Sequence, residues 1–233
     1  MINITVGENQ KFELPNKWDE ITIEQYAKMI SLIKHYKLHE DKTETSKVNK
    51  EQKALDNLRC SQEIFAYLTG MKQSEVARID FSQMQTLIAE MSTLLQSQDV
   101  LKKDIENGTV EQTDHFVLKG IKYYFPKMNL EETTFGDYIE TQQLNVANAE
   151  SEAGRFGVMS EQMAILCKEQ GVENTPELIK KKTRLFSKLG MDIVWQFIFF
   201  LMVQTNTSTK NLALYSKMAT EMETAMQQKI GTS

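Results

Sequence analysis

Residues 192–203 read DIVWQFIFFLMV, the most apolar stretch in a chain of 233 residues. A helix that spans a bilayer needs about 20 consecutive apolar residues. This run is shorter, because Asp192 and Gln204 bound it and Gln196 interrupts it. A helix that is apolar on all sides has to be covered on all sides. The stretch therefore predicts a helix in the protein core or, alternatively, one that a partner covers.

The composition around this stretch predicts a mainly helical protein. Glycine (10 residues) and proline (3 residues) are few, and Leu, Met, Lys, Glu and Gln are plentiful, which favours helix over sheet. The net charge of −5 argues against a general affinity for nucleic acid, which requires a basic surface. Cys60 and Cys167 are the only cysteines, so we expect buried free thiols and a reducing cytoplasm.

Hydrophobic periodicity divides the chain into helices and polar connections. Residues 1–98 are expected to form a hairpin and helices, 99–113 a linker, and 114–233 a second hairpin and a helical bundle. The two halves can also pack as one domain. A polar loop is expected at 39–50. The expected helices are 22–38, 50–69, 74–79, 80–98, 134–149, 155–170, 175–189, 191–205 and 208–229.

Two β-hairpins are expected, one at the start of each half. Ile2–Val6 and Lys11–Leu14 flank the turn residues GEN at 7–9. Residues 115–118 and 121–125 flank Lys119-Gly120. Extended residues on both sides of a Gly-containing turn are typical of hairpins. The fold class predicted from the sequence is therefore a helical bundle with two small hairpins.

The two hairpins introduce what resembles an internal repeat. The first ends in FELP and the second in YYFP. Each is followed by a threonine ahead of a helix and by a tyrosine four residues later: Thr22 and Tyr26, then Thr134 and Tyr138. The shared order predicts a duplicated hairpin-plus-helix unit. Chance similarity is the alternative, because few residues are identical.

The sequence contains none of the common catalytic motifs. We found no GxSxG nucleophile elbow, no phosphate-binding loop and no GxGxxG. His35 and His39 have the four-residue spacing of a two-ligand metal site, but no HExxH pattern supports one, and two solvated histidines are the favoured interpretation. We therefore expect no enzyme activity, no cofactor or metal, and no small-molecule substrate. An enzyme of unfamiliar pattern remains a further hypothesis. Its candidate residues are Asp137, Tyr138, His115 and Cys167.

One basic cluster lies on the predicted helix 175–189. It comprises Lys180 to Lys182, Arg184 and Lys188. The apolar residues of this helix predict a face against the core, with all of the charges outside, where their long stems cover apolar surface. A solvated face is the favoured interpretation. Contact with nucleic acid or with an acidic protein neighbour is the alternative.

Aromatic and methionine side chains supply the candidates for structural or interface roles. Trp18 is expected to anchor the first hairpin on the helices, and Trp195 to lie in the centre of the C-terminal core. Methionine suits irregular cores and adaptable binding surfaces alike, so the last predicted helix can dock within the chain or on another chain. The candidates are Trp18, Tyr26, Tyr138, Trp195, Phe197, Phe199, Phe200, Met218 and Met222.

Several short motifs together resemble a family. They are the string Pro15, Trp18, Ile21, Thr22 and Tyr26, the sequences LTGM at 68–71 and MAIL at 163–166, residues Arg184 and Phe186, and MDIV at 191–194. In this order they resemble small tail-assembly and virion proteins of tailed bacteriophages, particularly Bacteroides-type and crAss-like phages. The loop 39–50 and the lack of a basic, proline-containing stretch after Leu166 depart from that pattern.

The resemblance implies a non-catalytic protein of tail or head–tail connector morphogenesis. It implies either a virion component or a tail assembly chaperone, in the virion or in the host cytoplasm during phage assembly. The expected partners are other phage structural proteins or further copies of the same chain, without a membrane. Hairpin edges and the C-terminal helices would make the contacts. The alternative is a nucleic-acid-binding regulatory module that uses helix 175–189.

Overall fold

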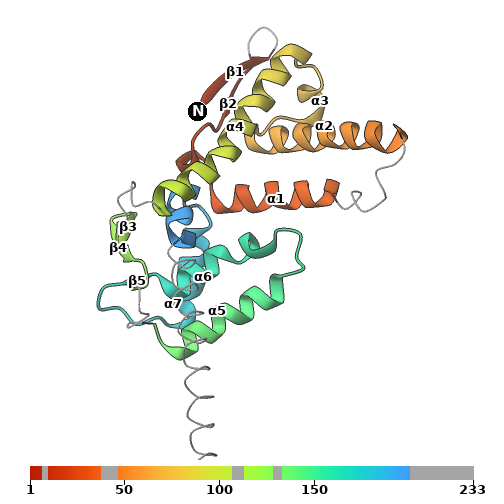
Figure 1. Ribbon diagram of the computed structural model, residues 1–233. Coiled ribbons are helices and arrows are strands. Elements are labelled where there is room, and N and C mark those ends of the chain that lie inside the picture. Colours follow the sequence, from red (N-terminus) through yellow and green to blue (C-terminus); the bar gives the residue numbers. More distant parts are fainter. Residues whose placement is uncertain (7–9, 38–46, 107–112, 128–132, 200–233) are drawn as a thin grey trace, which may run out of the picture.

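The computed structural model describes residues 1–6, 10–37, 47–106, 113–127 and 133–199. This part of the chain is mainly helical and contains two small antiparallel sheets, which confirms the predicted fold class (Figure 1). Residues 191–199 are helical as well. The elements are β1 (Ile2–Val6), β2 (Gln10–Leu14), η1 (Trp18–Glu20), α1 (Ile23–Lys37), α2 (Lys47–Thr69), α3 (Gln73–Val76), α4 (Phe81–Glu106), β3 (His115–Leu118), β4 (Ile121–Tyr124), α5 (Phe135–Asn148), η2 (Gly154–Gly157), α6 (Met159–Leu166), β5 (Lys168–Glu169) and α7 (Pro176–Phe186).

Both predicted hairpins are present. Strand β1 pairs with β2, and β3 pairs with β4, each antiparallel. Lys119 and Gly120 join β3 to β4 with positive φ angles of 50° and 79°, as a tight two-residue hairpin turn requires. A third strand, β5, pairs with β4. The sequence did not predict it, because two residues are too few to show a pattern.

The two predicted threonine caps have the same geometry. The Gln25 N–H donates to Thr22 Oγ1 (3.2 Å), and the Thr22 N–H donates to Gln25 Oε1 (2.9 Å). The Asp137 N–H donates to Thr134 Oγ1, and the Thr134 N–H donates to Asp137 Oδ2, both at 3.1 Å. Each pair is a capping box that satisfies N–H groups at a helix start. Both hairpin-plus-helix units therefore begin their helix in the same way.

Buried apolar side chains form two clusters. The hairpin cluster lies between β1, β2, α1, α2 and α4, and includes Ile4, Leu14, Met29, Phe65 and Met91. The central cluster joins residues 18–26 to β3, β4, α6, α7 and residues 191–199. Its members include Trp18, Tyr26, Phe116, Met163, Phe186 and Trp195. Helix α1 contributes Met29 to the first cluster and Tyr26 to the second, so it is shared by both.

The start of α1 is tied to residues from near the end of α7. The Ile23 N–H donates to the Leu189 carbonyl oxygen (3.0 Å), and the Met191 N–H donates to that of Ile21 (2.8 Å). Gly190 allows this close approach, since a Cβ there would lie 2.9 Å from the Asp19 carbonyl oxygen. The N-terminal segment therefore completes its fold against the C-terminal half.

The apolar stretch at 192–203 is core as far as the structure describes it. Val194, Trp195, Phe197 and Phe199 are buried within the central cluster. Residues 200–203 and the expected helix 208–229 lie outside the described residues. Within the described ranges, we find no helix whose length and hydropathy would let it cross a membrane.

Several expected boundaries differ from the structure. Helix α4 continues through 99–106, part of the expected linker, because this stretch contains good helix formers such as Leu, Lys and Glu. Helix α2 already begins at Lys47, inside the expected loop 39–50. The expected helix 155–170 is broken up into η2, α6 and β5, because Lys168 and Glu169 leave the helix to pair with β4.

Candidate interaction surfaces

Four aromatic side chains meet edge to face in the central cluster. Ring centroids are 5.6 Å apart for Trp18 and Trp195, 5.6 Å for Tyr26 and Trp195, and 4.8 Å for Tyr26 and Phe156. The Trp195 side chain is 1% exposed, which confirms its predicted place in the core. Trp18 packs here, whereas Ile4 and Leu14 of the first hairpin belong to the hairpin cluster.

The remaining interface candidates are distributed between core and surface. Phe197 and Phe199 are buried in the central cluster. Tyr138 is 43% exposed on α5. Phe200, Met218 and Met222 lie outside the described residues. Among the described candidates, Tyr138 is therefore the one that a partner can reach.

The residues named for an unfamiliar enzyme make structural contacts. Cys167 is completely buried, and burial raises the pKa of its thiol, so it lacks the thiolate that a nucleophile needs. His115 Nδ1 lies 2.5 Å from Asp114 Oδ1 at the start of β3. Asp137 caps α5 and accepts a hydrogen bond from Lys168 Nζ. Within the described ranges, no three or more His, Cys, Asp or Glu residues form a group that could hold a metal ion.

Lys182 contradicts the expectation that all charges of the basic helix lie outside. Its side chain is 2% exposed, and Nζ donates to the Cys167 carbonyl oxygen and to Asn174 Oδ1, both at 2.8 Å. Burial lowers the pKa of this amine to about 8. Position 182 lies three residues after Ile179 and four before Phe186, so helical spacing alone places it on the inner face. Lys182 therefore fastens the turn after α6 to α7.

The other cations of α7 form an outward surface. Lys180, Lys181 and Arg184 are exposed, and within the described part of the chain none of them has an ion-pair partner. Lys188, which follows the helix, pairs with the Glu24 carboxylate of α1. We call Lys180, Lys181 and Arg184 the α7 outer face.

The inner face of α5 is mostly polar. Gln162 Nε2 of α6 donates to the Thr141 carbonyl oxygen (3.2 Å) and to Asn145 Oδ1 (2.7 Å). Lys168 Nζ donates to Asp137 Oδ2 at 3.0 Å. Leu144 adds a partly buried apolar contact with the central cluster. Hydrogen bonds and one ion pair therefore account for much of the attachment of α5.

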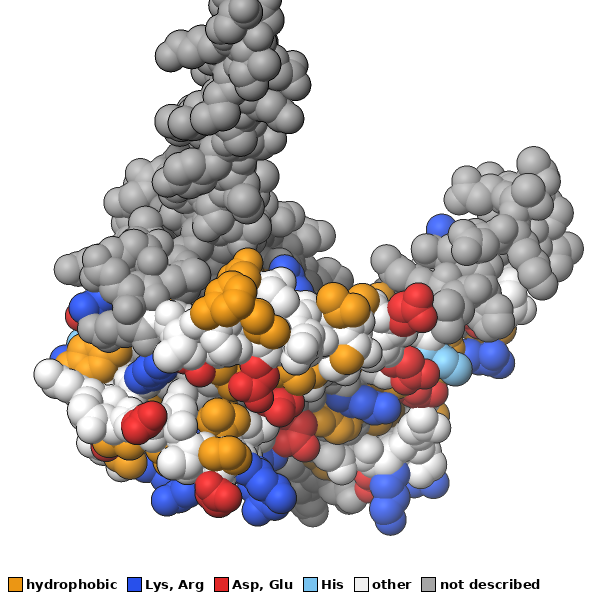
Figure 2. Space-filling model, turned by 90° about the horizontal axis from the view of Figure 1, so that it is seen from below, with side chains coloured by type: hydrophobic (Ala, Val, Ile, Leu, Met, Phe, Trp, Pro, Cys, Tyr) orange, Lys and Arg blue, Asp and Glu red, His pale blue; other side chains and the backbone are white. Residues whose placement is uncertain are grey.

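The outward side of α5, in contrast, carries four exposed apolar side chains, with the exposed Gln142 among them. Phe135 and Val146 are each 78% exposed, Tyr138 is 43% exposed and Ile139 is 39% exposed. Spacings of three, four and seven residues place these four side chains on one side of the helix. Figure 2 looks from below, the side on which α5 lies in Figure 1, and shows hydrophobic side chains at the surface among acidic and other polar ones. We call Phe135, Tyr138, Ile139 and Val146 the α5 outer face.

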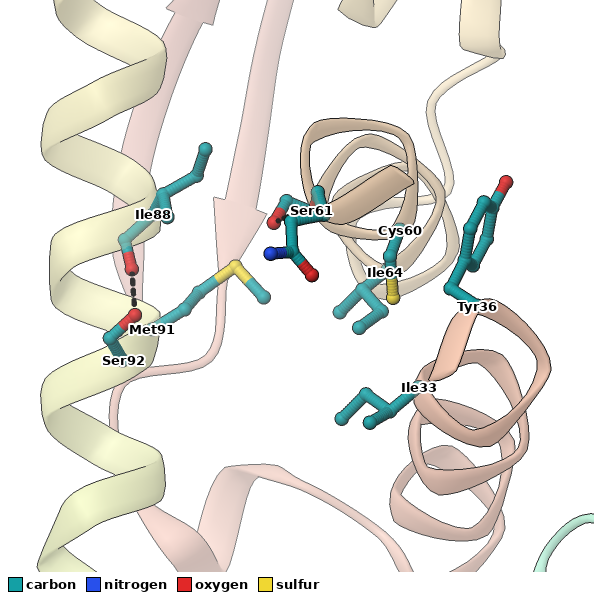
Figure 3. A pocket seen from close by; sticks show the side chains of 9 residues that line it. Ile33, Tyr36, Cys60, Ser61, Ile64, Ile88, Met91 and Ser92 are labelled. Atoms are coloured by element: carbon teal, nitrogen blue, oxygen red, sulfur yellow. Dashed lines mark hydrogen bonds between the residues drawn. The ribbon is translucent and has the colours of Figure 1, made fainter. Parts of the chain in front are cut away.

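Two hollows lie on the described surface. A cavity of about 210 Å³ opens between α1, α2 and α4 (Figure 3). Tyr36 Oη donates to Glu63 Oε1 (2.7 Å) beside it, and this hydrogen bond raises the pKa of Tyr36 to about 12. A wider recess of about 630 Å³ adjoins β4 and β5 and is lined by Tyr124, Lys168 and Glu169, among others. Figure 3 labels residues that line the first cavity, between α1, α2 and α4: Ile33, Tyr36, Cys60, Ser61, Ile64, Ile88, Met91 and Ser92.

Comparison with known proteins gave no guide to these surfaces. We found no protein-family model, no curated protein and no solved structure that matches the chain. A functional interpretation therefore depends on the geometry of the surfaces and on the motif resemblance in the sequence.

Proposed function

We propose that this chain is a non-catalytic structural or assembly protein of a tailed bacteriophage. It acts through protein–protein contacts in the morphogenesis of the tail or the head–tail connector, either as a virion component or as a tail assembly chaperone. The resemblance of its motifs to small tail-assembly and virion proteins supports the phage context. The α5 outer face supports the mode of action.

The carrying observation is that α5 exposes four of its apolar side chains and turns several polar ones toward the protein. Surface helices of globular proteins normally do the reverse. Covering apolar surface stabilises an assembly by roughly 25 cal/mol per Å² removed from water. Apolar side chains exposed along one side of a helix therefore suit contact with a protein partner.

The phage context is tested by quantitative mass spectrometry of purified particles beside the lysate of infected cells. A fixed stoichiometry in the particles identifies a virion component. Abundance in the lysate with absence from the particles identifies an assembly chaperone. Absence from both contradicts the phage proposal.

The mode of action is tested by photo-crosslinking in infected cells. A photoreactive residue is placed at Val146 on the α5 outer face and, as a matched control, at Gln85, an exposed position on α4. We expect protein adducts at position 146 and few at position 85. Equal yields at both positions would show that α5 is not a contact site.

A second candidate function is nucleic-acid binding by α7. It is favoured by Lys180, Lys181 and Arg184, which are exposed and have no ion-pair partner among the described residues, while the net charge of −5 opposes it. Phosphate contacts make affinity fall steeply with salt. Titration of labelled DNA and RNA at low and high salt tests the idea, and the absence of binding at low salt rejects it.

A further inference from the structure

We propose that the α5 outer face of one copy of this chain binds the α7 outer face of a second copy. This inference depends on the proposed function, because it names the partner for the apolar face that supports protein–protein contacts. The contact joins two different surfaces, so copies associate head to tail. Such an interface generates a closed ring or an open filament.

Charge complementarity is the first argument for this pairing. Residues 133–154 contain Asp137, Glu140, Glu150 and Glu152 and no Lys or Arg. Asp137 is engaged with Lys168, whereas Glu140 and Glu150 are exposed on α5 or just after it. The α7 outer face carries three cations without an ion-pair partner in the described part of the chain. Among the described residues, the exposed carboxylates on or just after α5 and the exposed cations of α7 thus both lack an ion-pair partner.

The side-chain chemistry of the two faces also matches. Phe135 and Tyr138 offer aromatic rings beside carboxylates, and Arg184 offers a planar cation that binds ring faces. The aliphatic stems of Lys180 and Lys181 can cover apolar side chains while their charged ends reach carboxylates. The fold already uses one such contact, since the Arg155 guanidinium lies 5.3 Å from the centre of the Phe156 ring.

The first hairpin-plus-helix unit shows what covers the corresponding position. Tyr26, the counterpart of Tyr138, is 4% exposed and packs against Trp195. The backbone of Leu189 accepts from α1, and Lys188 pairs with Glu24 at the edge of this contact. In the first unit, the segment from Lys188 to Trp195 therefore covers the tyrosine. In the second unit, Tyr138 is exposed.

The two faces cannot meet within one molecule. Helices α5 and α7 both pack on α6, and the faces at issue are the ones turned away from the protein. A pairing between them consequently requires two molecules. The interface is directional, since one copy supplies α5 and the other supplies α7.

Sedimentation velocity of the full chain over a wide concentration range tests the pairing. We expect the wild type to associate with increasing concentration, and less so at high salt, because exposed charge pairs are screened. An α5 variant carries Phe135→Glu and Val146→Glu, and an α7 variant carries Lys180→Glu, Lys181→Glu and Arg184→Glu. All five positions are exposed. Thermal denaturation confirms that each variant folds, and Phe81→Glu, at an exposed apolar position on α4, is the matched control.

Each variant alone should be monomeric, with association at least tenfold weaker than in the wild type or the Phe81→Glu control. An equimolar mixture of the two variants should form a one-to-one dimer and nothing larger, because it contains one intact α5 face and one intact α7 face. This result is specific to a head-to-tail contact.

Three results would overturn the inference. The first is a wild type that stays monomeric at every concentration. The second is an α7 variant that still assembles alone, which would indicate an α5–α5 contact. The third is a mixture of variants that fails to dimerise. If the wild type is monomeric but position 146 still crosslinks to another protein in infected cells, the proposed function stands and the self-pairing fails.

Discussion

The two hairpin-plus-helix units start their helices in the same way but differ in how far the tyrosine on the first turn is exposed. Each has a proline after its hairpin, a threonine capping box and a tyrosine on the first turn of the helix. Tyr26 is nevertheless 4% exposed, while Tyr138 is 43% exposed. A shared local motif therefore determines where a helix starts without determining which of its faces is buried.

The difference lies in what each helix packs against. At the start of helix α1, Gly190 forms a β-bridge with Thr22, and the Trp195 side chain packs against Tyr26. Helix α5 is held on its other side, by Gln162 and Lys168. Apolar burial thus anchors the first helix, and polar contacts contribute heavily to anchoring the second. The following predictions, ordered from the largest expected effect to the smallest, test this contrast.

Truncating the two tyrosines should give very different losses of stability. Tyr26→Ala removes a buried ring and should lower the free energy of unfolding by roughly 3–5 kcal/mol, as for other buried aromatic residues. Tyr138→Ala should change it by about 0.5 kcal/mol or less, as at other exposed positions. Urea denaturation of both variants measures the difference. Equal losses would mean that the α5 outer face is covered in the isolated chain.

The buried amine of Lys182 should make the free energy of unfolding depend on pH in the alkaline range. Lys182 lies on α7, which packs on α6 as α5 does. Burial lowers its pKa to about 8 in the folded protein, against an ordinary value of 10.5. Between these values the unfolded chain binds the proton and the folded chain does not, so the contribution of Lys182 to stability rises with pH and falls away as pH drops to 8. The expected gain between pH 7 and 9.5 is roughly 2 kcal/mol.

The measurement is urea denaturation of the wild type and of Lys182→Met at several pH values. Subtraction isolates this amine from Cys167, whose raised pKa acts in the opposite direction in both proteins. A difference in unfolding free energy that does not change with pH would contradict the prediction. Thr183→Met, one residue along the helix, serves as a control that leaves the amine in place.

The two helix caps should contribute about equally. Thr22→Ala and Thr134→Ala each remove a side-chain acceptor from a helix start, which typically costs about 1 kcal/mol. The free energies of unfolding of the two variants should thus agree closely although the tyrosines differ. Thr→Ser at each position should restore most of the loss. A much larger effect at Thr22 would indicate that its cap is coupled to the core.

As the pH is lowered, the polar contacts that hold α5 on the protein should weaken before the contacts that hold α1. Burial disfavours ionisation of Asp137, but hydrogen bonds from Lys168 and Thr134 outweigh this and lower its pKa. Its stabilising contribution is complete above the ordinary value of 3.8 and is lost as pH falls through the lowered pKa. Removing this partly buried ion pair should cost about 0.5–1 kcal/mol.

Amide hydrogen exchange at neutral pH checks this attachment with Asp137→Asn. Backbone amides of α5 should exchange faster than in the wild type, while those of α1 keep their protection. The Glu140→Gln variant, which removes an exposed carboxylate of the same helix, is the control. Uniform changes in both helices would show that α5 does not open independently.

Much of the fold could be predicted from the sequence because its signals are local. Lys119-Gly120 specifies a tight turn, and Thr22 with Gln25 specifies a capped helix start. The apolar run at 192–203 indicated a covered helix, and the described residues 191–199 are core. Each of these inferences required only neighbours within a few positions along the chain.

The missed features depend on partners that are distant in sequence. The outward turn of α5 follows from Gln162 and Lys168, whose pairing with α5 no spacing rule reveals. Helical spacing places Lys182 on the apolar side of α7, but a lysine is normally expected to be exposed. Its burial follows only from the Cys167 and Asn174 acceptors, which the sequence does not reveal. Strand β5 exists only through its pairing with β4.

The bonds between the start of α1 and the segment after α7 also affect how the chain is made. Glu24 and Lys188 are 164 positions apart. At synthesis rates of about 5–20 residues per second, roughly 10–30 s separate their emergence. During that interval the Tyr26 side of α1 lacks the cover that Trp195 and the backbone of Leu189 supply in the finished molecule. A newly synthesised N-terminal half therefore exposes apolar surface of α1 until the segment after α7 has been synthesised.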